Sequence, residues 1–185
     1  DKRDHYAQEI QKGVGYMNDI VMKNLELLQF DKEHKKVVRK EVNVRALFEE
    51  AFARYAGAME EKELHLAVEG ELKAKGDEEL LKKVAENLVT NCIRYTPEGG
   101  SIVLRFEKKG FTIRNDTLIE YQGSLKHLWE PFVRGEESRT GRGTGLGLAI
   151  VAHVLDRHSW KYELKYDKAQ KTFACVVRIP GGILF

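Results

Sequence analysis

The chain is poor in cysteine, in proline and in charge of one sign. Its 185 residues include two cysteines and three prolines, and 31 basic residues are balanced by 29 acidic ones. Cys92 and Cys175 form neither a CxxC pair nor a Cys/His cluster, which argues against a disulfide scaffold or a zinc site and favours reduced thiols in the cytosol. A net charge of +2 gives no overall field that would attract nucleic acid or a membrane surface.

Long hydrophobic runs are also missing. The most apolar stretch, 145–155, is short and contains His153, whereas roughly 20 apolar residues are needed to span a bilayer. We therefore expect neither a membrane span nor a signal peptide. The chain begins with a polar helical pattern instead of a methionine, and we expect it to be a fragment of a larger protein.

Residues 1–30 show a helical pattern about 45 Å long. Its apolar residues recur at alternating four- and three-residue steps: Tyr6, Ile10, Val14, Met17, Val21, Leu25 and Leu28. Such a stripe predicts a coiled coil or a four-helix bundle, and a core helix of the main domain is the alternative. The charged stretch 31–41 is expected to be a linker.

Residues 42–180 mix strands and helices without the regular alternation of a parallel doubly wound sheet. We expect helices over 44–60, from Asp77 to Pro97 and over 146–155, strands over 64–68, 72–74, 101–108, 111–115, 162–166 and 172–179, a mobile loop over 123–143, and a tail over 181–185. These elements predict an α+β fold, a two-layer α/β sandwich in which about three helices cover one mixed sheet.

The helix after Asp77 carries two asparagines on its otherwise apolar face. Asn87 and Asn91 are four residues apart, so both project from one face, with Arg94 and Tyr95 one turn further on. Amide oxygens can coordinate Mg²⁺ while a guanidinium takes phosphate charge. Hydrogen bonds from the asparagines to a neighbouring loop are the alternative, and the pair alone does not decide between them.

A glycine-rich turn, GRGTGLGLAI over 141–150, leads directly into an apolar helix. Glycines let backbone N–H groups approach an anion, and the start of a helix adds its dipole. Phosphate is the expected ligand. The pattern is neither GxGxxG nor GxxxxGK, which argues against dinucleotide folds and P-loop NTPases.

Taken in order, NLVTNCIRYTPEGG, IRND, LWEPFVRG and GTGLGLAI resemble the N, G1, F and G2 boxes of sensor histidine kinases, with the closest likeness to the VanS-like subgroup. The resemblance covers 77–180. Upstream, the stretch from Val42 resembles the start of the same ATP-binding domain, and residues 1–30 resemble the second helix of the dimerisation domain.

The resemblance implies the Bergerat (GHKL) ATP-binding fold, with ATP and Mg²⁺ as cofactors. It makes Asn91 the principal Mg²⁺ ligand with Asn87 beside it, and places Arg94 on the phosphates and Tyr95 on adenine. The phosphates would be held from the backbone by Gly143, Thr144, Gly145, Leu146, Gly147 and Leu148. Phe132 and Arg134 would close the site, with 123–143 as its lid.

Two positions bear on the chemistry. Hsp90-like relatives carry a glutamate base where this chain has Asn87, which accepts no proton at neutral pH and so favours phosphoryl transfer over hydrolysis. Family spacing aligns Asn115 with the adenine-binding aspartate of the G1 box, Thr117 with the first glycine of that box and Ile119 with the second. Asp116 is the rival for the first role, but strand alternation points it to the opposite face. A flipped Asn115 amide would face guanine O6, so we expect weak adenine selectivity.

The implied function is transfer of the ATP γ-phosphoryl group to a histidine on a helix missing from this chain, for relay to a response-regulator aspartate. The implied partners are a second copy, bound through the N-terminal helix, and the response regulator, with no nucleic acid and a membrane only through missing segments. The chain would be the cytoplasmic portion of a membrane-anchored sensor.

No SHELRTP-like phosphoacceptor box surrounds any of the six histidines. We therefore expect the chain to bind Mg-ATP without autophosphorylating. Two other readings stay open: an ATPase of the gyrase or MutL kind, and a nucleotide-sensing or degenerate binding module without kinase activity.

Overall fold

A five-stranded mixed sheet forms one layer of the computed structural model, which describes residues 2–32, 36–133 and 144–181, and only the backbone at 26 and 28–32. In spatial order the strands are β2 (His65–Glu69), β4 (Ser101–Glu107), β5 (Gly110–Asp116), β7 (Thr172–Arg178) and β6 (Lys161–Asp167). β2 and β4 are parallel and all other neighbours are antiparallel. The mixed sheet confirms the predicted α+β class.

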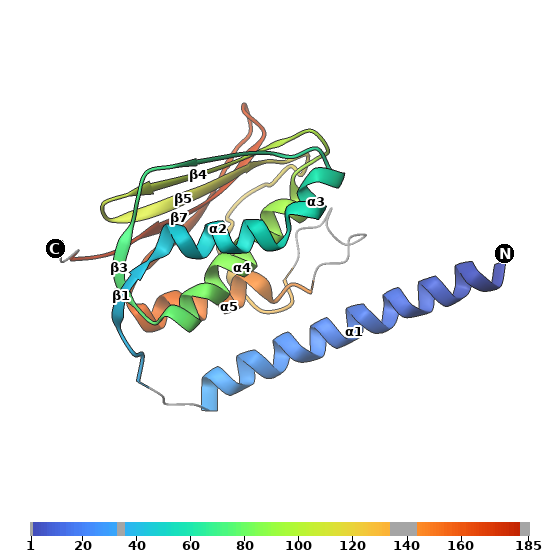
Figure 1. Ribbon diagram of the computed structural model, residues 1–185, viewed down its shortest axis with the longest axis horizontal. Helices are drawn as coiled ribbons and strands as arrows, with labels where there is room; N and C mark the ends of the chain where they lie inside the picture. Colours follow the sequence, from blue (N-terminus) through green and yellow to red (C-terminus); the bar gives the residue numbers. More distant parts are fainter. Residues whose placement is uncertain (1, 33–35, 134–143, 182–185) are drawn as a thin grey trace.

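Three helices form the second layer, on one face of the sheet (Figure 1). They are α2 (Val44–Arg54), α4 (Glu78–Tyr95) and α5 (Gly147–His158), and α4 contacts both of the others. The core lies between the layers, where Phe48 of α2 packs on Phe106 and Phe111 of the sheet with ring centroids 5.8 and 5.0 Å away. The predicted two-layer sandwich is therefore confirmed.

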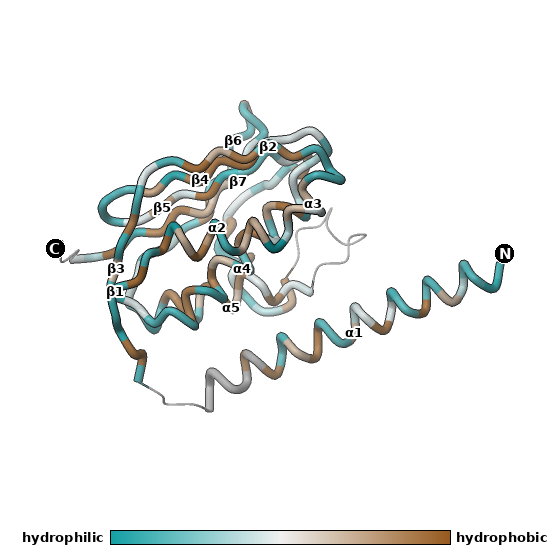
Figure 2. The backbone as a smooth tube through the Cα atoms, in the orientation of Figure 1, coloured by the Kyte–Doolittle hydropathy of each residue, from teal (hydrophilic) through white to brown (hydrophobic). Residues whose placement is uncertain are grey.

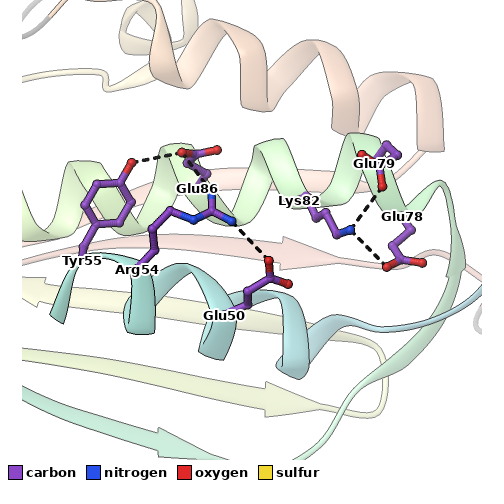
Figure 3. A network of polar contacts seen from close by, with 7 residues as sticks. All are labelled: Glu50, Arg54, Tyr55, Glu78, Glu79, Lys82 and Glu86. Atoms are coloured by element: carbon purple, nitrogen blue, oxygen red, sulfur yellow. Dashed lines mark hydrogen bonds and ion pairs between the residues drawn. The ribbon is translucent and has the colours of Figure 1, made fainter.

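Polar contacts at the edge of the core join α2 to α4 (Figure 3). The Tyr55 hydroxyl donates to Glu86 Oε1 over 3.0 Å, and the Arg54 guanidinium reaches both Glu50 and Glu86. Burial and the hydrogen bond to Glu86 raise the pKa of Tyr55. Such exposed ion pairs link α2 to α4 but stabilise little by themselves.

Two expected elements differ in the structure. The helix predicted over 44–60 begins as expected, with Asn43 Oδ1 accepting from Ala46 N, but it breaks at Tyr55 into α2 and the short α3 (Ala56–Glu61). The end of the expected linker forms β1 (Lys40–Asn43), which pairs with β3 (Lys73–Gly76), and Val42 is buried at this edge.

Part of the expected loop 123–143 is packed. A 3-10 helix, η1 (Lys126–Trp129), buries Leu128, and the ring of Trp129 lies edge-on to Tyr162 at 4.6 Å. These apolar contacts were hidden in the sequence because one 3-10 turn has no recognisable period. The expectation of a mobile, unpacked loop is therefore wrong for 126–129, and 134–143 lie outside the described residues.

The N-terminal pattern forms one long helix, α1 (Lys2–Lys32), which runs along the side of the helical layer that faces away from the sheet (Figure 1). Apolar residues recur along it (Figure 2), and six residues of the predicted stripe, Tyr6, Ile10, Val14, Met17, Val21 and Leu25, are 47–66% exposed. The side chain of Leu28 lies outside the described residues. Among the described residues no helix has the length and apolar character needed to cross a bilayer.

Candidate functional site

A cleft opens between the C-terminal half of α4, the start of α5, and strands β5 and β7. Its volume, open mouth included, is about 890 Å³. The described residues that line it are Lys23, Leu88, Asn91, Cys92, Arg94, Tyr95, Ile113, Asn115, Thr117, Tyr121, Leu128, Val133, Thr144, Gly145, Gly147, Leu148, Phe173 and Cys175. The two motifs singled out in the sequence, on α4 and before α5, thus line one cleft.

The two asparagines of α4 face the first residue of α5. Gly147 has no side chain, and a Cβ there would lie 3.2 Å from Asn87 Oδ1 and 3.6 Å from the Asn91 amide. Asn87 is 7% exposed and its Nδ2 donates to Lys83 O over 2.8 Å, which leaves its oxygen turned toward Gly147. Two amide groups and a helix start therefore meet at one point.

The start of α5 is shaped by a tight turn. Gly145 has φ +71°, and a Cβ there would lie 3.0 Å from the Phe132 Cα, so this position requires glycine. Thr144 Oγ1 accepts from Leu146 N, and Phe132 N donates to Gly145 O over 2.8 Å. The N–H groups of a helix's first turn have no acceptor within the helix. Those of α5 are therefore available to an anion in the cleft.

Asn115, at the end of β5, is 4% exposed on the cleft side. Its Nδ2 donates to Asp116 O over 2.7 Å, and its Oδ1 accepts from Cys92 Sγ at 3.7 Å. A flipped amide would place two acceptors, Oδ1 and Asp116 O, against each other. The Asp116 carboxylate is used elsewhere, since it accepts from Ser101 N over 2.8 Å.

Two buried thiols lie beside Asn115. Cys92 on α4 and Cys175 on β7 both line the cleft and are both reduced. Burial raises the pKa of Cys175 to about 12 and raises that of Cys92 as well. At neutral pH these thiols are therefore uncharged and act as small apolar groups in the floor of the cleft.

The charged residues that line the cleft are Lys23 and Arg94, and the described lining includes no aspartate or glutamate. Arg94 and Tyr95 belong to the last turn of α4. That turn is held by Lys62, whose Nζ donates to the carbonyls of Ile93, Arg94 and Thr96 over 2.7, 3.2 and 2.6 Å. The cleft is thus suited to an anionic ligand.

Most of the predicted site residues meet at this cleft. Those that line it are Asn91, Arg94, Tyr95, Asn115, Thr144, Gly145, Gly147 and Leu148, and Asn87 lies beside Gly147. Arg134 and Gly143 lie outside the described residues.

Besides Asn87, three predicted residues do not line the cleft: Ile119, Phe132 and Leu146. The N–H of Ile119 donates to Thr117 Oγ1, Phe132 is 57% exposed, and the side chain of Leu146 is buried. Thr117 lines the cleft in place of Ile119. Sequence reasoning also missed Tyr121 and Phe173, whose rings lie 5.0 Å apart. Phe173 and Cys175 are two residues apart on β7, which indicates that both lie on one face of the sheet. The spacing does not indicate that this face lines the cleft.

Comparisons with known proteins agree with this geometry. A family model described as "Histidine kinase-, DNA gyrase B-, and HSP90-like ATPase" matches residues 76–182. The sensor-like histidine kinase SenX3 of Mycobacterium tuberculosis is 27% identical over 161 residues, covering 83% of this chain and 39% of SenX3. The phosphate regulon sensor protein PhoR of Pseudomonas aeruginosa is 40% identical over 108 residues, covering 55% of this chain and 24% of PhoR.

This chain therefore spans less than half the length of these curated relatives. Solved structures share its fold. The catalytic domain of histidine kinase ThkA superposes with a TM-score of 0.65 at 22% identity, covering 77% of this chain and 95% of ThkA. Full-length ShkA, in complex with AMPPNP, superposes with a TM-score of 0.78 at 16% identity, covering 97% of this chain and 39% of ShkA.

Proposed function

The chain belongs to the family of histidine kinase-, DNA gyrase B- and HSP90-like ATPases, and from this premise we propose that it is the Mg-ATP-binding catalytic part of a two-component sensor histidine kinase. The observation that carries the proposal is the meeting of Asn87, Asn91 and Gly147 at the edge of a cleft whose described lining holds two cations and no carboxylate. A nucleotide with its phosphates at the start of α5 and its base beside Asn115 fits that arrangement. The VanS-like subgroup stays a prediction.

The residues present also fit a magnesium ion. Mg²⁺ prefers oxygen ligands and is commonly held by a few protein oxygens together with substrate phosphates. The amide oxygens of Asn87 and Asn91 would hold it, with phosphate oxygens as the charged ligands. When bound, the ion would neutralise charge on the transferring phosphoryl group. Arg94 adds a guanidinium from the same wall of the cleft.

Asn87 favours a kinase over an ATPase. An amide cannot take a proton from water, and its Nδ2 is already bound to Lys83 O. We therefore propose that the γ-phosphoryl group passes to a histidine on a helix absent from this chain and then to a response-regulator aspartate. The names of SenX3 and PhoR, both sensor proteins, support this reading.

α1 is the proposed second helix of the dimerisation domain, and residues 42–180 are the proposed catalytic domain. The exposed stripe from Tyr6 to Leu25 supports pairing with a second copy, because burying six large apolar side chains would contribute several kcal/mol. We propose that the full-length protein is a homodimer through α1 and that this chain is its cytoplasmic portion.

Calorimetric titration with a non-hydrolysable ATP analogue, with and without Mg²⁺, tests the binding step. We expect Mg²⁺ to strengthen binding by about tenfold or more. Asn91→Ala should remove that gain. Thr90→Ala is the matched control, because Thr90 lies on the same turn and its hydroxyl bonds back to Glu86 O, not to the cleft. An affinity for the analogue that changes neither with Mg²⁺ nor on Asn91→Ala would contradict the proposal.

Radiolabelled ATP tests the transfer step. The chain alone should neither acquire stable label nor release phosphate quickly, because no phosphoacceptor box surrounds its histidines and Asn87 stands where related ATPases carry a base. Acid-labile, base-stable label on the isolated chain would show that one of its own histidines is the acceptor.

A further inference from the structure

Helix α1 lies against the nucleotide cleft with one particular face. Tyr16, Ile20, Lys23 and Leu27, spaced three or four residues apart, are half-buried, whereas the stripe from Tyr6 to Leu25 is exposed. The helix contacts α5. Of this half-buried face, Lys23 lines the cleft itself. The proposed dimerisation helix therefore places a cation in the proposed ATP site.

The surroundings of Lys23 leave its charge poorly matched. The side chain is 21% exposed, and its ion pair is with Asp19 of the same helix at 3.9 Å, the outer limit of such contacts. Asp19 is itself 47% exposed, so water screens this attraction. The other charged group in the described lining is Arg94, also a cation. Two cations in one cleft, with no carboxylate among its described lining residues, point to an anionic ligand.

We propose that Lys23 binds the phosphate chain of the nucleotide and thereby ties α1 to the catalytic domain whenever the site is occupied. This inference rests on the proposed ATP-binding function, and it adds a phosphate contact from outside the nucleotide-binding fold. A lysine is suited to the role, because its ammonium is a mobile point charge on a long stem and can follow the phosphates without fixed geometry.

The proposal makes the docking of α1 depend on phosphate and not on the base. ATP and ADP would hold α1 in place, whereas adenosine would fill the base end of the cleft and give Lys23 no phosphate to bind. Since the exposed stripe lies on another face of α1, a docked helix would still be free to pair with a second copy.

The test measures the dissociation constants of the ATP analogue and of adenosine for the wild-type chain, Lys23→Met and Lys23→Arg. We expect Lys23→Met to weaken analogue binding by about 5- to 20-fold, less than a fully buried charged hydrogen bond would give. Lys23→Arg should retain most of the affinity, and adenosine binding should not change. Lys12→Met is the matched control, because Lys12 is on the same helix, pairs with Glu9 and lies outside the cleft.

Hydrogen exchange gives a second readout. The analogue should slow amide exchange around Lys23 in the wild-type chain but not in Lys23→Met, and adenosine should slow it in neither. Analogue affinity of Lys23→Met within twofold of wild type, or an equal loss in Lys12→Met, would overturn the role of Lys23. If the wild-type chain bound no nucleotide, the proposed function would fall first. If Asn91→Ala lost binding while Lys23→Met did not, only this inference would fall.

Discussion

Lys62 gives the sharpest stability prediction, because one ammonium holds the end of the helix that carries Arg94 and Tyr95. Its Nζ donates to three carbonyls, those of Ile93, Arg94 and Thr96, at 2.7, 3.2 and 2.6 Å. Helix C-termini leave their last carbonyls without intrahelical donors and carry a partial negative charge. Burial lowers the pKa of Lys62, so part of the gain is offset by desolvation.

Lys62→Met keeps the length of the stem and removes all three bonds. A hydrogen bond to a charged group contributes about 1.5–3 kcal/mol, but three such values do not add here, because water can reach the freed carbonyls and the ammonium is only partly buried. We expect a loss of about 2–3 kcal/mol in the free energy of unfolding, which lowers Tm by about 4–12 °C.

Urea unfolding followed by the fluorescence of Trp129 and Trp160 measures this loss. Lys82→Met, on the helix whose end Lys62 holds, is the matched control, since Lys82 makes exposed pairs with Glu78 and Glu79 and its loss should leave the midpoint unchanged. Because Arg94 and Tyr95 lie in the turn that Lys62 holds, Lys62→Met should also weaken nucleotide binding. A change in unfolding free energy below about 0.5 kcal/mol, within the range of ordinary surface substitutions, would refute the reasoning.

Three further predictions concern pH, thiols and base selectivity. Burial lowers the pKa of His158 below 6.5, and its Nε2 accepts from Asp77 N. As pH falls, the imidazole therefore takes up a proton in the unfolded chain before it does so in the folded one. The unfolding free energy should fall as pH drops below 6.5, and it should fall less in His158→Gln. Ellman's reagent should label Cys92 and Cys175 only in denaturant, and rapid labelling of the folded chain would contradict their burial. Because Asp116 O fixes the Asn115 amide, ADP should bind at least about tenfold tighter than GDP; Asn115→Ala should erase the difference and Asp116→Asn should not.

The last prediction replaces an expectation from the sequence. From the sequence, an asparagine in the G1 box suggested weak adenine selectivity, because an amide can flip. The hydrogen bond from Asn115 Nδ2 to Asp116 O opposes the flip. It could not be foreseen, because it depends on how the chain turns after β5. The choice of Asn115 over Asp116 for the cleft face did follow from strand alternation, and the contact of Asp116 with Ser101 N agrees with it.

Local signals predicted the elements that carry the site. The apolar period of α4 and the start of α2 after Asn43 are features of short segments and appear in the structure as expected. β1 was missed because its strand character comes from pairing with β3, which lies about 30 residues away in the sequence. Long-range pairing is not encoded in local propensity.

The residues that complete the site from a distance were missed for the same reason. Lys62 reaches the end of α4 from the end of α3, and Lys23 reaches the cleft from α1. In the sequence each is one lysine among many charged residues. Only the folded chain shows that one of them meets three carbonyls and that the other lines a cleft whose described residues include no carboxylate.

The most direct test of the central claim, that Mg-nucleotide binds between α4 and α5, is the change in backbone amide chemical shifts when the ATP analogue and Mg²⁺ are added. The account predicts the largest changes at Asn91, Asn115, Gly145 and Gly147. The hollow between β6 and the segment 121–129, lined by residues such as Leu164, is the natural comparison, because it is a second opening on the same molecule. If the largest chemical-shift changes fell along β6 and the amide shifts of Gly145 and Gly147 stayed the same, the account would be contradicted.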